Sequence, residues 1–287
     1  MKIKFKPCPR CRRPMCELDN TSYCLHCGYN EEEKEPYKPQ FRRYVIDGNK
    51  EIADLCKINL ANNLDASLTY CLKRGMTTSS INKWELGYVP DGFGRFREKD
   101  MWSRRLLFVV RSTDGKAIIG FGGRIITSED RPKYVNSVAS QEYEKRKNLY
   151  GSWFVPEHTD IIYLCEGYMD VITMDQHGYA YPVASLGTSL TTEQSEWIRQ
   201  HTNKVVICFD SDEPGQIATT RAIELLKNAG FEYEEIKILK ITGAKDIDEC
   251  LAKGGGRPKE ISVGQYFTEK SMWKELSTIM MEGGSAL

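Results

Sequence analysis

The chain has 287 residues, of which 40% are hydrophobic and 28% are charged, and its formal net charge is zero. This length allows one to three domains, and this composition is that of a globular protein and not of a fibrous or intrinsically disordered chain. The sequence has no apolar stretch as long as a membrane span, and its N-terminus lacks the apolar run of a signal peptide, so we expect a cytoplasmic protein.

The zero net charge hides a segregation along the chain. Residues 95–151 contain 13 lysines and arginines against 7 acidic residues, whereas residues 160–250 contain 7 against 16. The first segment is suited to bind phosphates and the second to bind cations. For either segment alone, a solvated charged surface is the alternative interpretation.

Residues 1–30 are predicted to form a zinc ribbon. Two Cys-x-x-Cys pairs, 12 residues apart, can each supply half of a tetrahedral zinc site. The predicted ligands are Cys8, Cys11, Cys24 and Cys27, with Cys16 and His26 as spare candidates. A site of this kind is structural, and it would present the surrounding basic residues to a nucleic acid. Coincidental or disulfide-forming cysteines are the alternative.

Residues 31–50 are predicted to be a linker, because the segment from Glu31 to Gln40 is rich in charge and proline. A subdomain over residues 51–158 is expected to follow. It begins with a helix over residues 65–73 and a second short helix after a Thr/Ser cap.

Strands are then expected over residues 106–110 and 117–121. Both runs are apolar and rich in β-branched residues, and the Asp114-Gly115 pair between them predicts a hairpin turn. The subdomain is therefore expected to be mixed α/β.

Residues 159–255 are predicted to form an α/β domain. Apolar strand-like runs alternate there with helical segments, which is typical of βαβ units and a mainly parallel sheet. The strands are expected at 161–165, 181–185, 204–209 and 235–241. Residues 256–287 form a C-terminal tail for which the sequence predicts no role.

Acidic residues follow several of these strands in short motifs. They are Glu166 and Asp170, Asp210 and Asp212, and Asp246 and Asp248. Because the carboxyl ends of parallel strands meet in one crevice, we expect these carboxylates to lie close together. Hard divalent cations would relieve their repulsion, so we expect two or more Mg²⁺ or Mn²⁺ ions there.

The same segments resemble a known family. EGYMDVITMDQHGY, ASLGTSLT, CFDSDEPGQIATTRA and KDIDECL are similar, in order and spacing, to the Toprim domain of bacterial-type DNA primases. The upstream runs RRLLFVV, GKAIIGFGGRI, PKYVNS and NLYG resemble the basic RNA-polymerase subdomain of that family. The resemblance covers roughly residues 65–255. It implies an α+β multidomain fold of zinc ribbon, mixed α/β basic subdomain and Toprim domain.

The resemblance also implies a function, which is the synthesis of RNA primers on a single-stranded DNA template from ribonucleoside triphosphates. It assigns Glu166, Asp210 and Asp212 to catalysis, and these three with Asp170, Asp246 and Asp248 to metal binding. Glu166 would serve either as an acid/base group or as a ligand. The implied nucleic-acid and nucleotide contacts are Arg105, Arg124, Lys133, Tyr134, Asn136 and Lys145.

The chain departs from the family pattern in three ways. Cys11 stands where the family commonly has a histidine ligand, and Arg146 replaces a glycine after Lys145. The chain also ends where a helicase-binding domain would begin, so a replicative helicase stays only a candidate partner. The compact form suggests an enzyme of a phage or mobile element, which would act in the host cytoplasm. A metal-dependent nuclease and a non-catalytic zinc-ribbon protein that binds DNA are the alternative functions.

Overall fold

The computed structural model describes residues 4–7, 14–18, 21–23, 44–62, 67–96, 99–127, 131–138, 143–144, 146–186, 189–252, 254 and 257–271. The chain consists of two compact units, Met1–Arg42 and Arg43–Leu287. None of the described helices has the length and apolar character that a membrane span needs.

The first unit contains a small antiparallel sheet in the order β1-β2-β3. Its strands are β1 (Lys4–Pro7), β2 (Pro14–Leu18) and β3 (Thr21–Tyr23). The four cysteines predicted to bind zinc lie outside the described residues. In sequence, one pair falls between β1 and β2 and the other follows β3.

The second unit begins with helices. They are α1 (Tyr44–Asn62), α2 (Thr69–Lys73) and α3 (Thr78–Lys83). The side chain of Thr77 caps α3 by accepting a hydrogen bond from the N–H of Ser80 at 3.1 Å, so the predicted cap is confirmed. The linker prediction ran to residue 50, but the backbone is already helical from Tyr44.

An antiparallel sheet follows, in the order β4-β5-β6-β7. Its strands are β4 (Gly87–Val89), β5 (Arg105–Arg111), β6 (Ile118–Ile125) and β7 (Tyr134–Asn136), with the short helix α4 (Lys99–Trp102) before β5. The predicted hairpin between β5 and β6 is confirmed. Gly115 takes the left-handed φ of +71° that its turn requires.

The remainder forms a five-stranded sheet in the order β12-β11-β10-β8-β9. Its strands are β8 (Ile162–Cys165), β9 (Pro182–Ala184), β10 (Val205–Cys208), β11 (Ile236–Lys240) and β12 (Lys259–Ser262). Only β12 pairs antiparallel, which confirms the prediction of a mainly parallel sheet.

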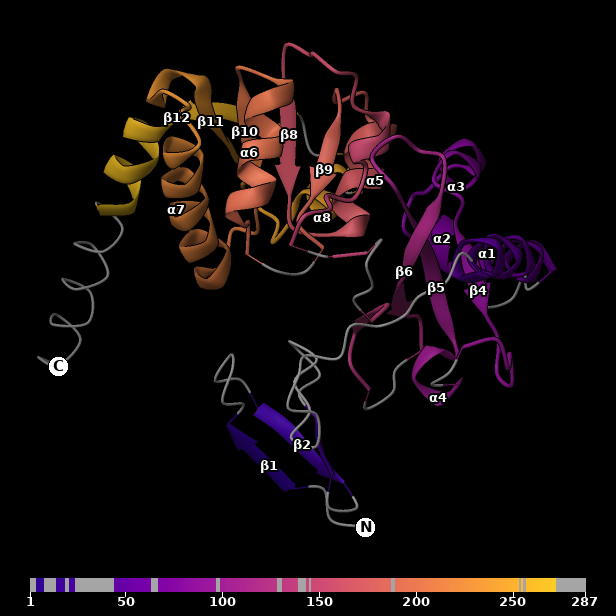
Figure 1. The fold of residues 1–287 in the computed structure, drawn as a ribbon. Coiled ribbons are helices and arrows are strands. Elements are labelled where there is room, and N and C mark those ends of the chain that lie inside the picture. The colour runs from indigo at the N-terminus through magenta and orange to yellow at the C-terminus, as the bar shows by residue number, and fades with distance from the viewer. Residues whose placement is uncertain are drawn as a thin grey trace, which may run out of the picture. The chain divides into compact units, whose positions relative to one another are not determined.

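Helices cover both faces of this sheet. They are α5 (Tyr168–Gln176), α6 (Thr192–His201), α7 (Glu213–Asn228) and α8 (Ile247–Ala252). Two 3₁₀ turns, η2 (Ser152–Phe154) and η3 (Tyr233–Glu235), and a helix over residues 263–271 complete the described elements. Figure 1 shows α6 and α7 together on one face.

The strand sequences explain this double coverage. Val205 and Ile207 pack into one buried cluster with residues of α6 and α7, whereas Val206 and Cys208 pack into another with residues of α5 and α8. Successive side chains of a strand point to opposite faces, so a strand that is apolar throughout needs a cover on both sides.

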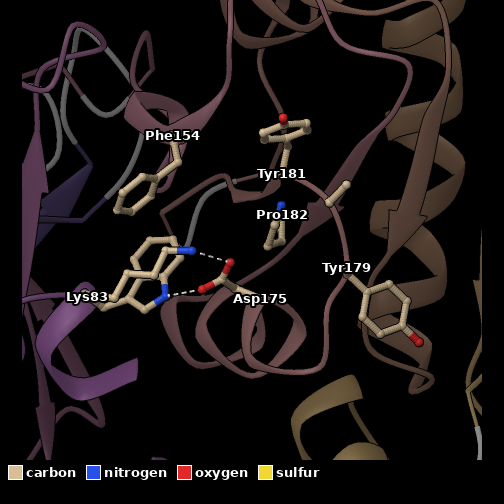
Figure 2. A pocket seen from close by; sticks show the side chains of 8 residues that line it. Lys83, Phe154, Asp175, Tyr179, Tyr181 and Pro182 are labelled. Atoms are coloured by element: carbon tan, nitrogen blue, oxygen red, sulfur yellow. Dashed lines mark hydrogen bonds and ion pairs between the residues drawn. The ribbon is translucent and has the colours of Figure 1, made fainter. Parts of the chain in front are cut away.

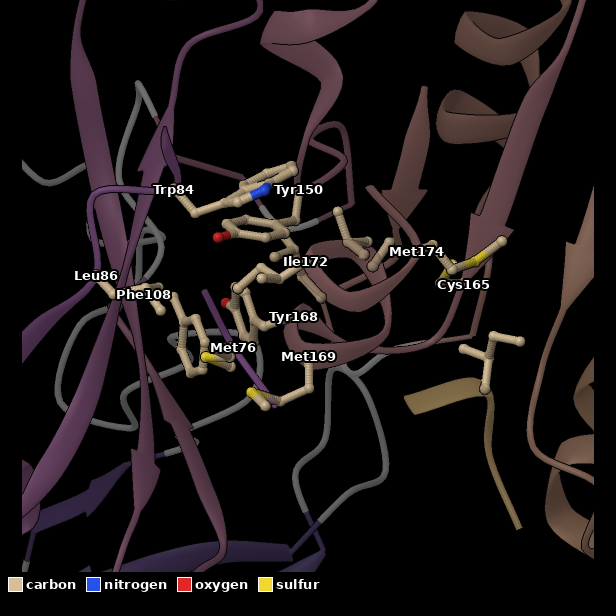
Figure 3. Close-up of a cluster of buried hydrophobic side chains, with 14 of the residues drawn as sticks. Met76, Trp84, Leu86, Phe108, Tyr150, Cys165, Tyr168, Met169, Ile172 and Met174 are labelled. Atoms are coloured by element: carbon tan, nitrogen blue, oxygen red, sulfur yellow. The ribbon is translucent and has the colours of Figure 1, made fainter. Parts of the chain in front are cut away.

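The second of these clusters continues into the antiparallel sheet, and Figure 3 shows its centre. The rings of Phe108 in β5 and Tyr168 in α5 stack with centroids 4.6 Å apart. Gly122 in β6 allows this approach, because a Cβ atom there would lie 2.4 Å from the Tyr168 ring. The two sheets of the second unit therefore share one hydrophobic core, and α5 is fixed between them.

Candidate active site

The predicted acidic motifs follow neighbouring parallel strands. Glu166 comes directly after β8, and Asp210 comes two residues after the end of β10. Asp246 lies in the loop that leads from β11 to α8. The sheet order β11-β10-β8 makes these three strands neighbours. Their carboxyl ends therefore meet at one edge of the sheet, where ligands bind in folds of this kind.

Glu166 and Asp210 are in direct contact. Oε1 of Glu166 accepts a hydrogen bond from the backbone N–H of Asp210 at 2.9 Å. Asp212 is the N-cap of α7, and its Oδ1 accepts from the N–H of Gly215 at 3.1 Å. A Cβ atom at Gly215 would lie 2.2 Å from the carbonyl oxygen of Asp210. The start of α7 is thus packed against Asp210, and this contact fixes both aspartates relative to Glu166.

Asp170 and Asp246 have their own backbone partners. Asp170 is 8% exposed, and its Oδ2 accepts a hydrogen bond from the N–H of Gly167 at 3.1 Å. Asp246 accepts a hydrogen bond from the N–H of Glu249 at 2.7 Å, which caps the start of α8. Both carboxylates are therefore held at helix N-termini, where the helix dipole stabilises negative charge.

Asp248 is buried and paired. Its Oδ1 accepts a hydrogen bond from the hydroxyl of Thr173 at 2.6 Å, and its Oδ2 forms an ion pair with the guanidinium of Arg74. Arg74 is the residue after α2, so this pair joins the first helices of the unit to α8. The Asp248 carboxylate is thereby neutralised from within the protein.

Burial and the neighbouring carboxylates shift the pKa of Asp170. Burial raises this pKa well above its ordinary value, and the charges of Asp246, Asp248 and Asp210 raise it further. The hydrogen bond from Gly167 opposes the shift. Asp170 therefore shares one electrostatic environment with three of the other predicted carboxylates.

Glu166 and Asp210 are shifted in the same direction. Burial is the largest cause of the raised pKa of Glu166; the N–H of Asp210 opposes it, and the charges of Asp210 and Asp212 add to it. The pKa of Asp210 is also raised, by burial and then by Asp246, against the effect of Lys245. The negative charge at this edge is therefore only partly compensated by neighbouring cations of the protein.

Lys245 provides part of that compensation. Its Nζ lies 3.1 Å from Oδ2 of Asp212 and 3.5 Å from Oδ2 of Asp210. The hydrogen bond to Asp212 is the largest cause of the raised pKa of Lys245. The pKa of Asp212 is lowered, first by the N–H of Gly215 and then by Lys245.

The donor set fits a hard divalent cation. Within the described residues, no three side chains of His, Cys, Asp or Glu are arranged as a finished metal site, and Lys245 and Arg74 contact several of the carboxylates instead. All candidate ligands are carboxylate oxygens, which Mg²⁺ and Mn²⁺ prefer. The raised pKa values of Asp170, Asp210 and Glu166 are those of an anionic cluster that binding of a cation would relieve.

The basic candidates Arg124 and Lys133 lie on the antiparallel sheet next to this edge. Nη1 of Arg124 donates to the hydroxyl of Tyr134 at 2.6 Å, and its guanidinium lies over the rings of Tyr70 and Tyr134. Lys133 is exposed, and its Nζ lies 5.9 Å from the centre of the Tyr134 ring. Although Lys133 is exposed, partial desolvation by the surrounding protein lowers its pKa, and the charges of Arg124, Lys245 and Arg74 lower it further, whereas Asp246 raises it.

The remaining candidates differ in their surroundings. Oδ1 of Asn136 accepts a hydrogen bond from the hydroxyl of Tyr168, which links β7 to α5. Lys145 lies outside the described residues.

The assignment of Arg105 to a nucleic-acid groove needs correction. Arg105 is 0% exposed, so its charge does not reach a surface. Its guanidinium donates to the backbone carbonyls of Met101, Gly123 and Lys133 at 2.6 to 3.3 Å. Arg105 is therefore a structural residue that ties α4 to the antiparallel sheet.

Sequence reasoning missed three residues of the site, Arg74, Thr173 and Lys245. Arg74 and Thr173 contact Asp248 from positions 174 and 75 residues away along the chain, a pairing that no local pattern reveals. Lys245 is the first residue of the KDIDE motif, so its place next to Asp246 in sequence is a signal that the sequence does offer.

A pocket of about 330 Å³ lies elsewhere in the second unit, between α3 and the far end of α5. Figure 2 shows its lining, which includes Lys83, Phe154, Asp175, Tyr181 and Pro182. None of the predicted site residues lines this pocket, so it is separate from the carboxylate cluster.

Comparisons with known proteins identify two regions within the second unit. Residues 95–155 match the family described as the N-terminal domain of the DNA primase catalytic core, and residues 163–251 match the Toprim-like family. A DNA primase of Clostridium acetobutylicum is 35% identical over 79% of this chain, and one of Haemophilus influenzae is 34% identical over 80%. These alignments cover 41% and 44% of the two relatives, so the chain spans less than half their length.

Solved structures give the same result. A DnaG primase catalytic domain bound to single-stranded DNA is 26% identical, with a TM-score of 0.65 over 75% of this chain and 78% of that structure. The zinc-binding and RNA polymerase domains of the Aquifex aeolicus primase share the fold, with a TM-score of 0.67 over 91% of this chain and 81% of that structure, at 22% identity. Over the residues that these comparisons cover, the chain therefore belongs to the bacterial-type DNA primases and carries the two parts of their catalytic core.

Proposed function

We propose that this chain synthesises short RNA primers on single-stranded DNA from ribonucleoside triphosphates, in the cytoplasm. The observation that carries the proposal is the convergence of the strand-end carboxylates beside the sheet that holds Arg124 and Lys133. Arg124 is buried, at 9% exposure, and Lys133 is exposed. An anionic cluster next to such cations is the arrangement that phosphoryl transfer between polyanions needs.

In the proposed reaction, the 3′-hydroxyl of one ribonucleotide attacks the α-phosphate of the next, and pyrophosphate leaves. Mg²⁺ or Mn²⁺, held by Glu166, Asp210, Asp212 and Asp246, would supply electrostatic stabilisation of the transferring phosphoryl group. The raised pKa of Glu166 also suits it to accept a proton from the attacking hydroxyl, so both of its roles remain in the proposal.

Asp170 and Asp248 have supporting roles in this proposal, because both are buried and hydrogen-bonded within the protein. The charge of Asp170 would raise the affinity of the cluster for cations, whereas Arg74 neutralises the charge of Asp248. The pairing of Asp248 with Arg74 would keep α8, and hence Asp246, in register with β10.

Arg124 and Lys133 are proposed to bind phosphates of template or nucleotide. The contacts of Arg124 with Tyr70 and Tyr134 hold its guanidinium in one orientation, whereas Lys133 is exposed and acts as a point charge. Tyr134 and Asn136 would position this surface, because they join Arg124 and α5 to β7.

Cys8, Cys11, Cys24 and Cys27 are proposed to bind one structural zinc. The proposal is supported by the paired Cys-x-x-Cys spacing around three short β-strands, which is typical of a zinc ribbon.

Single-stranded DNA is proposed as the template. The similar DnaG catalytic domain that was solved with single-stranded DNA bound supports this choice.

A template-dependent assay tests the proposal. Labelled ribonucleotides should be incorporated into short RNA products only in the presence of single-stranded DNA and a divalent cation. Asp210→Asn should remove this synthesis at unchanged fold. Release of nucleotides from DNA without incorporation would instead support the alternative of a nuclease.

A further inference from the structure

Lys245 is built into the carboxylate cluster. Its backbone carbonyl accepts hydrogen bonds from the N–H and the hydroxyl of Ser211 at 2.8 and 2.9 Å, and its own N–H donates to the carboxylate of Glu249 at 2.8 Å. Ser211 stands between Asp210 and Asp212 in sequence. The main chain therefore fixes Lys245 opposite these two aspartates, and its ammonium reaches both of them.

The Lys245 ammonium can move away from the two aspartates. The Lys245 side chain is 57% exposed, and lysine is a flexible point charge with four rotatable carbons. The other cation of the cluster, Arg74, is held differently, because its partner Asp248 is only 3% exposed and is also bound to Thr173. Arg74 is thus held in place, whereas the ammonium of Lys245 can be displaced.

We propose that Lys245 is a tethered counter-ion, which neutralises Asp210 and Asp212 in the metal-free protein and yields them when a divalent cation binds. This inference rests on the proposed function, since Asp210 and Asp212 are the carboxylates assigned there to the cation. Binding of the cation must break both contacts of Lys245, so the lysine weakens the metal affinity of the site and sets the concentration at which it fills.

The size of the effect follows from the type of contact. Exposed ion pairs of lysine and carboxylate contribute modestly, and only the fraction of molecules with free carboxylates is competent to bind. Removal of Lys245 should therefore tighten binding of a divalent cation by about three- to tenfold. The effect should shrink as salt is added, because the contacts are screened.

A titration of the full chain with Mn²⁺ alone tests this, with electron paramagnetic resonance reporting the free ion. The part of the Mn²⁺ binding that is lost in the Asp210→Asn variant is assigned to the carboxylate site. Lys245→Ala should lower the dissociation constant of that site about three- to tenfold, and Lys245→Gln should do the same. Lys245→Arg keeps the charge and should stay within about twofold of the parent. Lys240→Ala is the matched control, because Lys240 pairs with Glu269 at 2.7 Å and not with the cluster.

Thermal unfolding gives a second measurement on the same variants. Without Mn²⁺, Lys245→Ala should unfold at a lower temperature than the parent, and added Mn²⁺ should stabilise it by a larger increment. Unchanged or weaker Mn²⁺ affinity in Lys245→Ala and Lys245→Gln overturns the inference while primer synthesis by the parent leaves the proposed function standing. A parent chain with no Mn²⁺ binding sensitive to Asp210→Asn would overturn both.

Discussion

Asp175 accepts a hydrogen bond from the indole nitrogen of Trp84 at 3.0 Å, and this contact joins the end of α5 to the residue that follows α3. The second carboxylate oxygen of Asp175 forms an ion pair with Lys83 at 2.7 Å, as Figure 2 shows. Trp84 is only 2% exposed. Its N–H therefore depends on Asp175 for a partner, and the two sheets of the second unit are tied together here.

The first prediction is that Asp175→Ala destabilises the protein without changing the chemistry. Loss of the acceptor leaves a buried indole N–H unsatisfied, which should lower the free energy of unfolding by about 1 to 3 kcal/mol. Urea denaturation measures this, with Asp160→Ala, at an exposed position, as the control. A loss below about 0.5 kcal/mol would mean that the contact is not a structural tie.

The second prediction concerns Asp170 and pH. Its pKa in the folded protein is raised by burial and by neighbouring carboxylates, so the native state binds this proton more tightly than the unfolded chain. Ionisation of Asp170 consequently reduces stability as pH rises through the folded-state pKa, and the penalty is absent below the unfolded value.

Asp170→Asn should therefore raise the free energy of unfolding at neutral pH. The gain should shrink as pH falls below the folded-state pKa of the parent and should vanish below the unfolded-state pKa. Urea denaturation of both proteins across this range measures it, and Asp160→Asn serves as the control. A variant that is less stable than the parent at neutral pH, or a gain that does not depend on pH, contradicts the assigned cause.

The third prediction distinguishes the basic residues proposed to bind phosphates from the carboxylates proposed to bind cations. Lys133→Ala removes an exposed cation, and if its partner is a template phosphate, the slope of log K against log salt should shrink by about 0.7 for single-stranded DNA. If its partner is the nucleotide, template affinity should hold while the apparent affinity for ribonucleotides falls. Arg124→Ala should follow the same pattern.

Asp212→Asn is the counterpart variant, because it removes negative charge near phosphates. It should preserve or tighten template binding while synthesis is lost. Salt-series binding and synthesis assays distinguish these variants. Full retention of both template and ribonucleotide affinity in the Arg124 and Lys133 variants would favour the solvated-surface interpretation of the basic segment.

The fourth prediction is that the purified protein contains one zinc. The double variant Cys24→Ser plus Cys27→Ser should lose it, and residues 1–30 should unfold while the second compact unit keeps its structure. Metal analysis together with thermal unfolding measures both effects. Absence of zinc from the parent protein would rule out the ribbon.

The sequence predicts the parallel sheet and the strand-end positions of the carboxylates because both depend on local patterns. Apolar β-branched runs such as Val205 to Cys208 give the strands, and acidic residues directly after them mark the edge. The helix Tyr44–Asn62 was not predicted, because its first residues were assigned to the linker on composition alone.

Contacts between distant segments are the part that the sequence could not supply. Arg105 lies in a basic segment, which predicts a contact with nucleic acid. In the structure its guanidinium instead donates to backbone carbonyls of β6 and of the segment before β7. Arg74 reaches Asp248 only because the two sheets share one core. Such pairings follow from tertiary packing, which no spacing along the chain records.

Catalysis of RNA primer synthesis by the strand-end carboxylates is tested most directly by comparing the parent chain with the Asp210→Asn variant. Parent and Asp210→Asn proteins are assayed for incorporation of labelled ribonucleotides on single-stranded DNA, with folding checked by urea denaturation. We expect short RNA products from the parent and a loss of at least about 100-fold in the folded variant, as is usual for electrostatic groups in catalysis. Variant activity within about tenfold of the parent, or a parent that releases nucleotides from DNA without incorporating any, would contradict it.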